Sequence, residues 1–270
     1  MNASTHPRPP AVAGLFYPGA TEDLTASVDA LLAAATPGPR SPIKALIVPH
    51  AGYGYSGSTA ATAYASLHAQ AQSIRRVVLL GPTHRVPVRG LAVPGCQAFA
   101  TPLGEIPLDT ETLGRLRLLP QVSTNDAAHA LEHALEVQLP FLQRRLGHFE
   151  LIPIAVGEAS PEIVANVLEA CWGGPETLIV VSSDLSHYLP YPVAQQIDDD
   201  TCRHILALDE HLSPQQACGA RPLNGLLLAA QRHGLNPELL ALCNSGDTAG
   251  DRQRVVGYAA FAFIEESRHA

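Results

Sequence analysis

Short apolar segments alternate with longer amphipathic segments along the whole chain, and this alternation predicts the secondary structure. Segments rich in Val, Ile and Leu favour strands, whereas apolar residues spaced three or four positions apart favour helices. Strands are expected at 43–48, 76–80, 149–155, 177–182, 238–243 and 254–264, with shorter ones near 89–93 and 97–99. Helices are expected near 22–35, 58–70, 109–118, 132–146, 160–171, 191–208 and 222–233.

Strands and helices in alternation are typical of βαβ units, in which helices cover both faces of a parallel sheet. Residues 77–80 and 179–181 are apolar without alternation, as strands buried on both faces should be. About ten residues separate the last two strands, so this pair could be antiparallel at an edge. We therefore expect an α/β fold: a single domain with a mostly parallel or mixed central sheet and helices on both faces.

Proline and glycine are spread through the connections, and no linker, internal repeat or low-complexity segment divides the chain. One domain over residues 1–270 is expected, with flexible tails at 1–7 and 266–270. Hydrophobic residues make up 46% of the chain and charged residues 16%, which is typical of an ordinary globular protein. The net charge of −8 without a basic cluster argues against nucleic-acid binding.

The expected compartment is the cytoplasm. The N-terminal sequence MNASTHPRPP has no apolar core, so no signal peptide is expected, and no apolar run is long enough for a membrane span. The five cysteines are widely spaced and form no C-x-x-C pair, which favours reduced thiols over a disulfide framework.

Chemically active residues follow four of the expected strands. The strand at 43–48 leads into His50, the strand at 76–80 into His84, and the strand at 238–243 ends at Cys243. The strand at 177–182 leads into Asp184 and His187. Because ligands bind beyond the carboxyl ends of strands in open α/β sheets, these residues are expected to share one site.

Each of these residues also has a simpler explanation. A single histidine after a strand is more often a hydrogen-bonded loop residue than a ligand. Cys243 could be a buried core thiol, and Asp184 could cap a helix. The coincidence of four strand ends favours the shared site.

A further cluster lies between residues 126 and 136. His129 and His133 are four positions apart and would share a helix face, as the ligands of a zinc protease do. The sequence is HALEH rather than HExxH, however, so the metalloprotease motif is absent. His133, Glu132 or Glu136 could instead support the site or line its rim.

Several motifs resemble the Memo family, also called AmmeMemoRadiSam system protein B, in order along nearly the whole chain. They are RPPAVAGLFYP at 8–18, VPHAGYGYSG at 48–57, LGPTH at 80–84, ATPLG at 100–104, EHALEVQLPF at 132–141 and SSDLSH at 182–187.

The resemblance implies a fold similar to class III extradiol dioxygenases, which open catechol rings with non-haem Fe(II). It implies His50, His84 and Cys243 as metal ligands and His187 as the acid–base histidine, with Asp184 beside it. It also implies partnership with a radical-SAM protein and its small companion domain. Within this arrangement, the residues expected to line the cleft and bind substrate are Phe16, Tyr17, Tyr53 and His133.

A thiolate ligand departs from the two-histidine, one-carboxylate set of the dioxygenases. One divalent ion is expected, Fe(II) first, with Cu or Zn possible because sulfur is a softer ligand. The leading hypothesis is an iron-dependent, dioxygenase-like oxidoreductase acting on an unknown small molecule. A non-catalytic module that binds a metal, a peptide or a partner protein remains open, as does a zinc hydrolase. Serine-hydrolase and nucleotide-binding motifs are absent.

Overall fold

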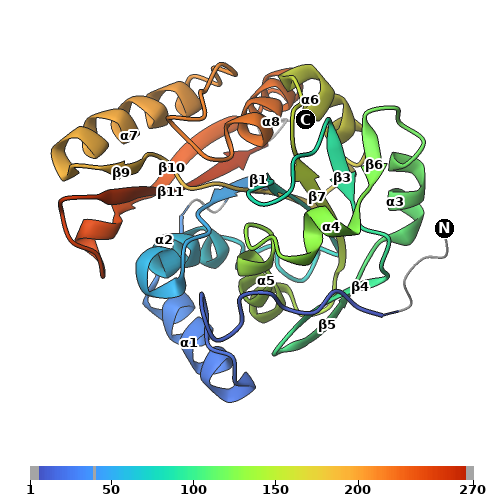
Figure 1. Cartoon of the computed structure of the whole chain (residues 1–270), viewed down its shortest axis with the longest axis horizontal. Helices are drawn as coiled ribbons and strands as arrows, with labels where there is room; N and C mark the ends of the chain where they lie inside the picture. The colour runs from blue at the N-terminus through green and yellow to red at the C-terminus, as the bar shows by residue number, and fades with distance from the viewer. Residues whose placement is uncertain (1–5, 39–40, 266–270) are drawn as a thin grey trace.

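A computed structural model of the chain describes residues 6–38 and 41–265. The tails expected at 1–7 and 266–270 lie outside these residues, apart from His6 and Pro7. The described part forms one mixed α/β domain around a central sheet (Figure 1). None of the described helices is long and apolar enough to cross a membrane.

The central sheet has the strand order β10-β11-β1-β8-β2-β7-β3-β6, and β9 pairs with β11. The strands β1, β8, β2 and β7 are parallel neighbours, whereas β11 is antiparallel to both β1 and β10. The strands are β1 (Ile43–Val48), β2 (Arg76–Pro82), β3 (Leu91–Val93), β6 (Val122–Thr124), β7 (Glu150–Val156), β8 (Thr177–Ser182), β9 (His187–Leu189), β10 (Asn236–Asn244) and β11 (Val255–Ile264). A separate hairpin contains β4 (Ala98–Thr101) and β5 (Gly104–Pro107).

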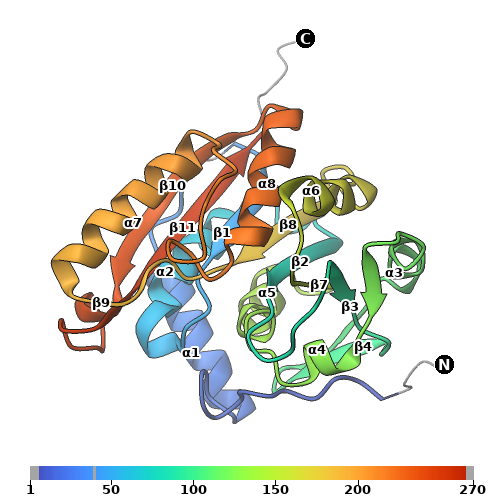
Figure 2. The same cartoon turned by 45° about the horizontal axis from the view of Figure 1, so that its top comes forward.

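Helices cover both faces of this sheet (Figure 2). One face carries α6 (Pro161–Ala170), α7 (Tyr191–Leu206) and α8 (Ala220–His233). The other carries α1 (Thr21–Ala34), α2 (Tyr53–Ser66) and α5 (Leu139–Leu146). The shorter α3 (Thr110–Leu116) and α4 (Asp126–Ala130) lie beside β3 and β6 (Figure 1). Two 3-10 turns, η1 (Glu136–Gln138) and η2 (Ser245–Asp247), complete the elements.

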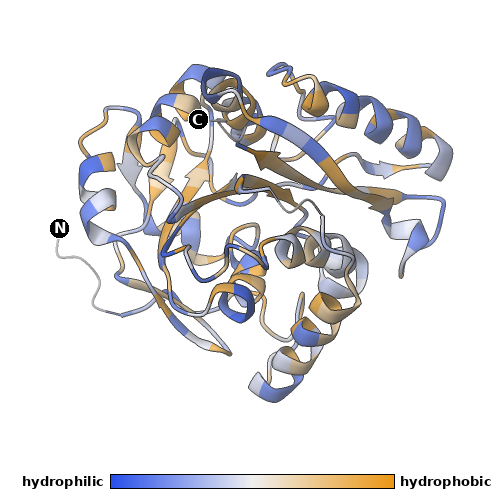
Figure 3. Ribbon diagram, turned by 180° about the vertical axis from the view of Figure 1, so that it is seen from behind, coloured by the Kyte–Doolittle hydropathy of each residue, from blue (hydrophilic) through white to orange (hydrophobic). Residues whose placement is uncertain are grey.

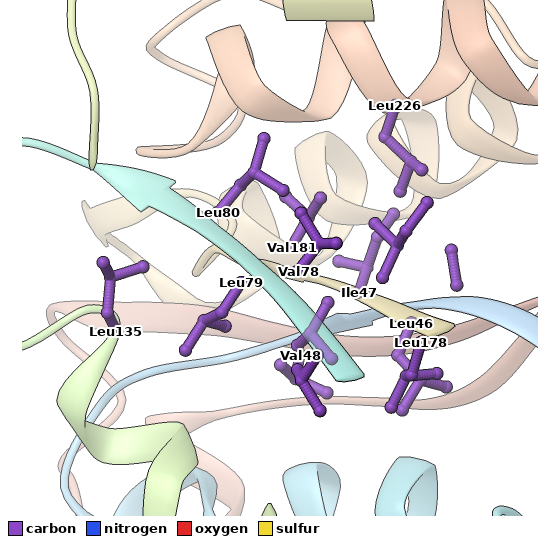
Figure 4. Close-up of a cluster of buried hydrophobic side chains, with 14 of the residues drawn as sticks. Leu46, Ile47, Val48, Val78, Leu79, Leu80, Leu135, Leu178, Val181 and Leu226 are labelled. Atoms are coloured by element: carbon purple, nitrogen blue, oxygen red, sulfur yellow. The ribbon is translucent and has the colours of Figure 1, made fainter. Parts of the chain in front are cut away.

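The central strands are buried on both faces, which explains their continuous apolar sequences. Ile47 is level with Val181 in the register, and both point toward Leu226 of α8 (Figure 4). Leu46 and Leu79 point to the opposite face, where α2 and α5 pack (Figure 4). Figure 3 shows the same layering, with hydrophobic strands between helices whose outer faces are hydrophilic. Each such side chain contributes roughly 1.5–3 kcal/mol by leaving water.

The structure confirms the expected fold class and contains every strand that the sequence predicts. The antiparallel pairing of β10 with β11 is also confirmed, with β10 at the sheet edge. The three short strands β5, β6 and β9 were not predicted, because three or four residues carry too little periodicity.

Two helix predictions need correction. The helix expected at 58–70 begins at Tyr53 and ends at Ser66. Its first turns contain Gly57, where a Cβ would lie 3.0 Å from Leu31, so glycine there allows α1 to pack closely against α2. The helix expected at 132–146 is regular only over α5. It is interrupted because the buried Glu132 carboxylate accepts the amide of Ala134 instead of leaving it for a helical carbonyl.

Asp109 offers a test of the local energetics. Its carboxylate caps α3 by accepting the amide of Thr112 at 2.8 Å, and it accepts Nε of Arg76 at 2.7 Å. Burial opposes ionisation of Asp109, but these hydrogen bonds and the Arg76 charge lower its pKa below 3.8. Stability from this carboxylate is therefore present above pH 3.8 and is lost as pH falls through the lowered pKa.

We expect Asp109→Ala to reduce the unfolding free energy by roughly 1–3 kcal/mol, because it removes both the cap and the ion-pair partner. Asp109→Asn keeps a capping oxygen and should lose less. Urea titrations at pH 7 and at pH 3 should show the difference between wild type and Asp109→Asn shrinking at the lower pH. Glu111→Gln on the exposed side of α3 is the control, with an effect below about 0.5 kcal/mol. An unchanged difference at both pH values would contradict this account.

Candidate metal centre

Three neighbouring parallel strands bring the predicted histidines and aspartate together. His50 follows β1, Asp184 follows β8 and His84 follows β2, and these strands are adjacent in the order β1-β8-β2. The ring centroids of His50 and His84 lie 5.2 Å apart. The grouping expected from the carboxyl ends of the strands is therefore present in the fold.

The cysteine that joins these histidines is Cys218, so the sequence prediction of Cys243 needs correction. Cys218 lies just before α8, with its Sγ 3.3 Å from Nε2 of His50. Ligand atoms of His50, His84 and Cys218 all lie within 4.8 Å of one another, and Cys243 forms no such group among the described residues.

Sheet topology explains the position of Cys243. It lies on β10, which β11 separates from β1, so two strand spacings of about 4.8 Å place it roughly 10 Å from the strand that carries His50. Its thiol contacts Oγ1 of Thr59 on α2 at 3.1 Å. Cys218 follows no strand, so the strand-end pattern could not identify it. The sequence feature that could have indicated it is its position just before a helix that has Pro222 in its first turn.

The hydroxyl of Ser182 determines the tautomer of His50. Ser182 donates to the carbonyl of Ala134 at 2.7 Å and accepts Nε2 of Gln138 at 2.8 Å. The hydroxyl has one proton, which it donates in the hydrogen bond to Ala134. The Ser182 oxygen must therefore accept a hydrogen bond from Nδ1 of His50, at 3.0 Å. His50 therefore carries its proton on Nδ1, and Nε2 faces Cys218 with an unshared electron pair.

Glu132 fixes His84 in the same way. One carboxylate oxygen accepts the backbone amide of His84 at 2.6 Å, and the other lies 2.8 Å from its Nδ1. Burial opposes ionisation of Glu132, but the hydrogen bonds from His84, together with the charge that this ring carries when it is protonated, lower the pKa of Glu132 to about 2. The carboxylate thus accepts a hydrogen bond from Nδ1–H, which leaves Nε2 of His84 as the ligand atom. Arg8 supports this arrangement by donating to the carbonyl of Glu132 at 2.7 Å.

Burial dominates the electrostatics of the donor set. It lowers the pKa of His50 to about 3, with the neighbouring His84 adding to the effect, so His50 is neutral. Burial and the nearby Asp184 raise the pKa of the Cys218 thiol to about 12. Without a cation the thiol is protonated and donates toward Nε2 of His50. A bound cation would be needed to stabilise the thiolate.

Asp184 and His187 occupy the same cavity as the two histidines. Asp184 accepts the backbone amide of His50 at 2.7 Å, and its Oδ2 lies 4.0 Å from Nε2 of His50. Burial raises the pKa of Asp184, against the hydrogen bond from His50. Nδ1 of His187 donates to the carbonyl of Leu185 at 2.8 Å, which leaves its Nε2 as a proton acceptor.

Two of the four predicted substrate-binding residues line this cavity, which has a volume of about 810 Å³. Phe16 packs against His133 with a centroid distance of 4.9 Å, and both are in the wall. Tyr17 and Tyr53 instead lie behind the wall, where their hydroxyls donate to Glu136 at 2.6 Å and to the carbonyl of Val137 at 2.9 Å. The wall also contains residues that the sequence pattern missed, among them Tyr55, Tyr188, Arg254 and Tyr258.

His129 does not share a face with His133, contrary to the helical spacing. The helix α4 ends at Ala130, so the two imidazoles diverge. His133 stacks on His84 at 4.8 Å, and burial lowers its pKa to about 4. His129 points away from this site and contacts the carbonyl of Ala92 at 3.0 Å.

Glu136 has a structural position. Its buried carboxylate accepts hydrogen bonds from the side chains of Arg8 and Tyr17 and from the amides of Ala11 and Val12. It therefore holds the N-terminal segment that places Phe16 at the cavity.

Comparisons with known proteins identify the family of this chain. The family described as Memo-like protein matches residues 8–262. A MEMO1 family protein of Aquifex aeolicus (strain VF5) is 34% identical over 273 residues, which cover 95% of this chain and 99% of that protein. A MEMO1 family protein of Methanosarcina acetivorans is 36% identical over 276 residues, covering 94% of this chain and 97% of that protein.

A solved structure supports the fold. An uncharacterized protein, JW3007, from Escherichia coli K12 superposes with a TM-score of 0.55 over 81% of this chain and 99% of that chain, at 12% sequence identity. At that identity the likeness extends to the fold alone. The match of the family over residues 8–262, together with relatives similar over nearly their whole length, shows that this chain belongs to the Memo family.

Proposed function

We propose that this protein binds one divalent metal ion through Nε2 of His50, Nε2 of His84 and Sγ of Cys218. The observation that carries the proposal is the assignment of protons. Ser182 and Glu132 each accept a hydrogen bond from Nδ1–H of a histidine, so the unshared electron pairs on the two Nε2 atoms and one thiol lie within 4.8 Å of one another. Two neutral imidazoles and a thiolate are a suitable donor set for a first-row transition metal.

Fe(II) is the first candidate, because the resemblance to the Memo family implies a fold similar to that of class III extradiol dioxygenases, which use non-haem Fe(II). Zn or Cu also suits a mixed histidine and thiolate site. A bound Fe(II) would supply open positions for an anionic substrate and for O₂. The function we favour is therefore a dioxygenase-like oxidoreductase acting on a small molecule.

Four residues around such a substrate would have separate roles: accepting a proton, forming the cavity wall and positioning His50. Nε2 of His187, held by the hydrogen bond from Nδ1 to Leu185, would accept a proton from a substrate hydroxyl. Phe16 and His133 would form an apolar wall against a flat substrate. Asp184 would hold His50 in place through its backbone amide and add negative charge beside the ligand atoms.

The cysteine assignment gives a direct prediction. Cys218→Ser should weaken Co(II) binding at least tenfold and abolish the thiolate-to-cobalt charge-transfer band, because the sulfur is a ligand. Cys243→Ser is the matched control and should leave both unchanged. Chelator competition and absorption spectra of anaerobically prepared protein would measure this. Loss of the band in Cys243→Ser but not in Cys218→Ser would reverse the assignment.

The role of Glu132 gives a second prediction. Glu132→Gln keeps an oxygen near Nδ1 of His84 but loses the charge that fixes its tautomer. Metal affinity should fall by about 10–100-fold, the usual cost of removing such a hydrogen-bond partner. Circular dichroism should show a folded protein, which separates this effect from misfolding. Equal affinity in the variant would mean that Glu132 does not tune the ligand.

His187 separates binding from chemistry. His187→Ala should retain the metal, because His187 is outside the donor set, but should reduce oxygen uptake with catechols by at least about 100-fold. Elemental analysis and an oxygen electrode would measure the two quantities. A metal-loaded wild type without turnover on any phenol would count against oxygenase chemistry.

The cavity favours a second candidate, a non-catalytic module that binds a peptide or partner protein. Tyr55 and Tyr188 line the cavity and remain 43% and 61% exposed, so two aromatic side chains at the cavity are open to contact by a partner. A partner interaction that persists in His187→Ala protein would favour this candidate over the enzyme.

A further inference from the structure

Another cavity lies at α4 and shares no lining residue with the cavity of the metal centre. Its volume is about 430 Å³, and it is enclosed by the segment 6–9, the residues after β3, and the C-terminal end of α4. Pro7, Pro9, Pro94 and Leu131 give it apolar walls. Leu131 is 60% exposed, so a large apolar side chain stands open at this cavity.

A buried histidine in the wall of this cavity has an unused acceptor. His129 is 2% exposed, and its Nε2 lies 3.0 Å from the carbonyl of Ala92. A carbonyl only accepts, so Nε2 carries the proton and Nδ1 carries an unshared electron pair. That Nδ1 is buried and has no hydrogen-bond partner among the described residues. Burial lowers the pKa of His129 to about 4, so the ring stays neutral.

A carboxylate lines the same cavity. Asp126 begins α4, and one of its oxygens accepts the amide of Gly95 at 2.6 Å. Arg8 also lines this cavity, but its charge is neutralised because it is paired with Glu136. Its Nε donates to the carbonyl of His129. The cavity therefore combines apolar walls with two hydrogen-bond acceptors, one of them negative.

We propose that this cavity binds a small aromatic cation with several N–H donors, such as an amidinium or a protonated heteroaromatic amine. The apolar body would lie between the prolines and Leu131. The N–H groups would donate to the carboxylate of Asp126 and to Nδ1 of His129. Such a ligand would supply a donor for the unpartnered nitrogen, and leaving a buried acceptor unpaired is unfavourable. The site is separate from the metal centre and does not depend on the function proposed above.

Benzamidine is a suitable probe, with neutral benzamide as the charge control. Calorimetry on the full chain should show saturable benzamidine binding, at least tenfold weaker in Asp126→Asn, and at least tenfold weaker for benzamide. In ¹⁵N spectra, benzamidine should shift the Nδ1 resonance of His129. His84→Ala should bind benzamidine like wild type, because His84 belongs to the other cavity.

A pair of helix variants tests the location. Ala130→Phe places a ring in the cavity from an exposed position and should abolish binding, whereas Ala127→Phe on the same helix lies outside the cavity and should not. Circular dichroism checks that both variants fold. The proposal would be overturned by the absence of saturable binding or by an unshifted Nδ1 resonance. It would also be overturned if Asp126→Asn and Ala130→Phe bound benzamidine as tightly as wild type, or if His84→Ala lost binding.

Discussion

The hydroxyl of Ser182 has a single proton, and the geometry of the candidate metal centre depends on where that proton goes. Because Ser182 donates this proton in a hydrogen bond to the carbonyl of Ala134, His50 has to donate to Ser182 from Nδ1 and presents Nε2 to the cavity. Gln138 supports Ser182 and is itself fixed by the hydroxyl of Tyr64 and the carbonyl of Pro49. A chain of buried hydrogen bonds therefore determines which nitrogen is available for a ligand, with Glu132 doing the same for His84.

The segment 129–138 connects this chemistry to the rest of the fold. Its carboxylates do not form helical ion pairs but are buried, with Glu132 bound to His84 and Glu136 bound to Arg8. Buried carboxylates are stable only when fully hydrogen-bonded, and these two take their donors from the N-terminal segment and from the loop after β2. The same segment thus fixes the orientation of His84 and holds the N-terminal segment that places Phe16 at the cavity.

Membership in the Memo family and the chemistry of the site rest on different observations. Similarity over nearly the whole chain shows the family. The likeness to a solved structure at 12% identity shows the fold. The proposed donor set rests instead on the hydrogen bonds of His50 and His84 and on the thiol of Cys218, which are properties of individual side chains. The choice of Fe(II) and of a dioxygenase-like reaction rests on the family resemblance.

The sequence by itself determined the α/β fold class and the position of every long strand, because strands buried on both faces require continuous apolar residues. It also placed His50, His84, Asp184 and His187 at one edge, since parallel strands end together. It could not identify the cysteine. A strand end predicted Cys243, but strand order is a tertiary property, and β11 lies between β10 and β1. Cys218 reaches the site from the segment just before α8, and the burial of Glu132 breaks the helix that periodicity predicted. Both depend on contacts between residues far apart in the chain, which local patterns do not encode.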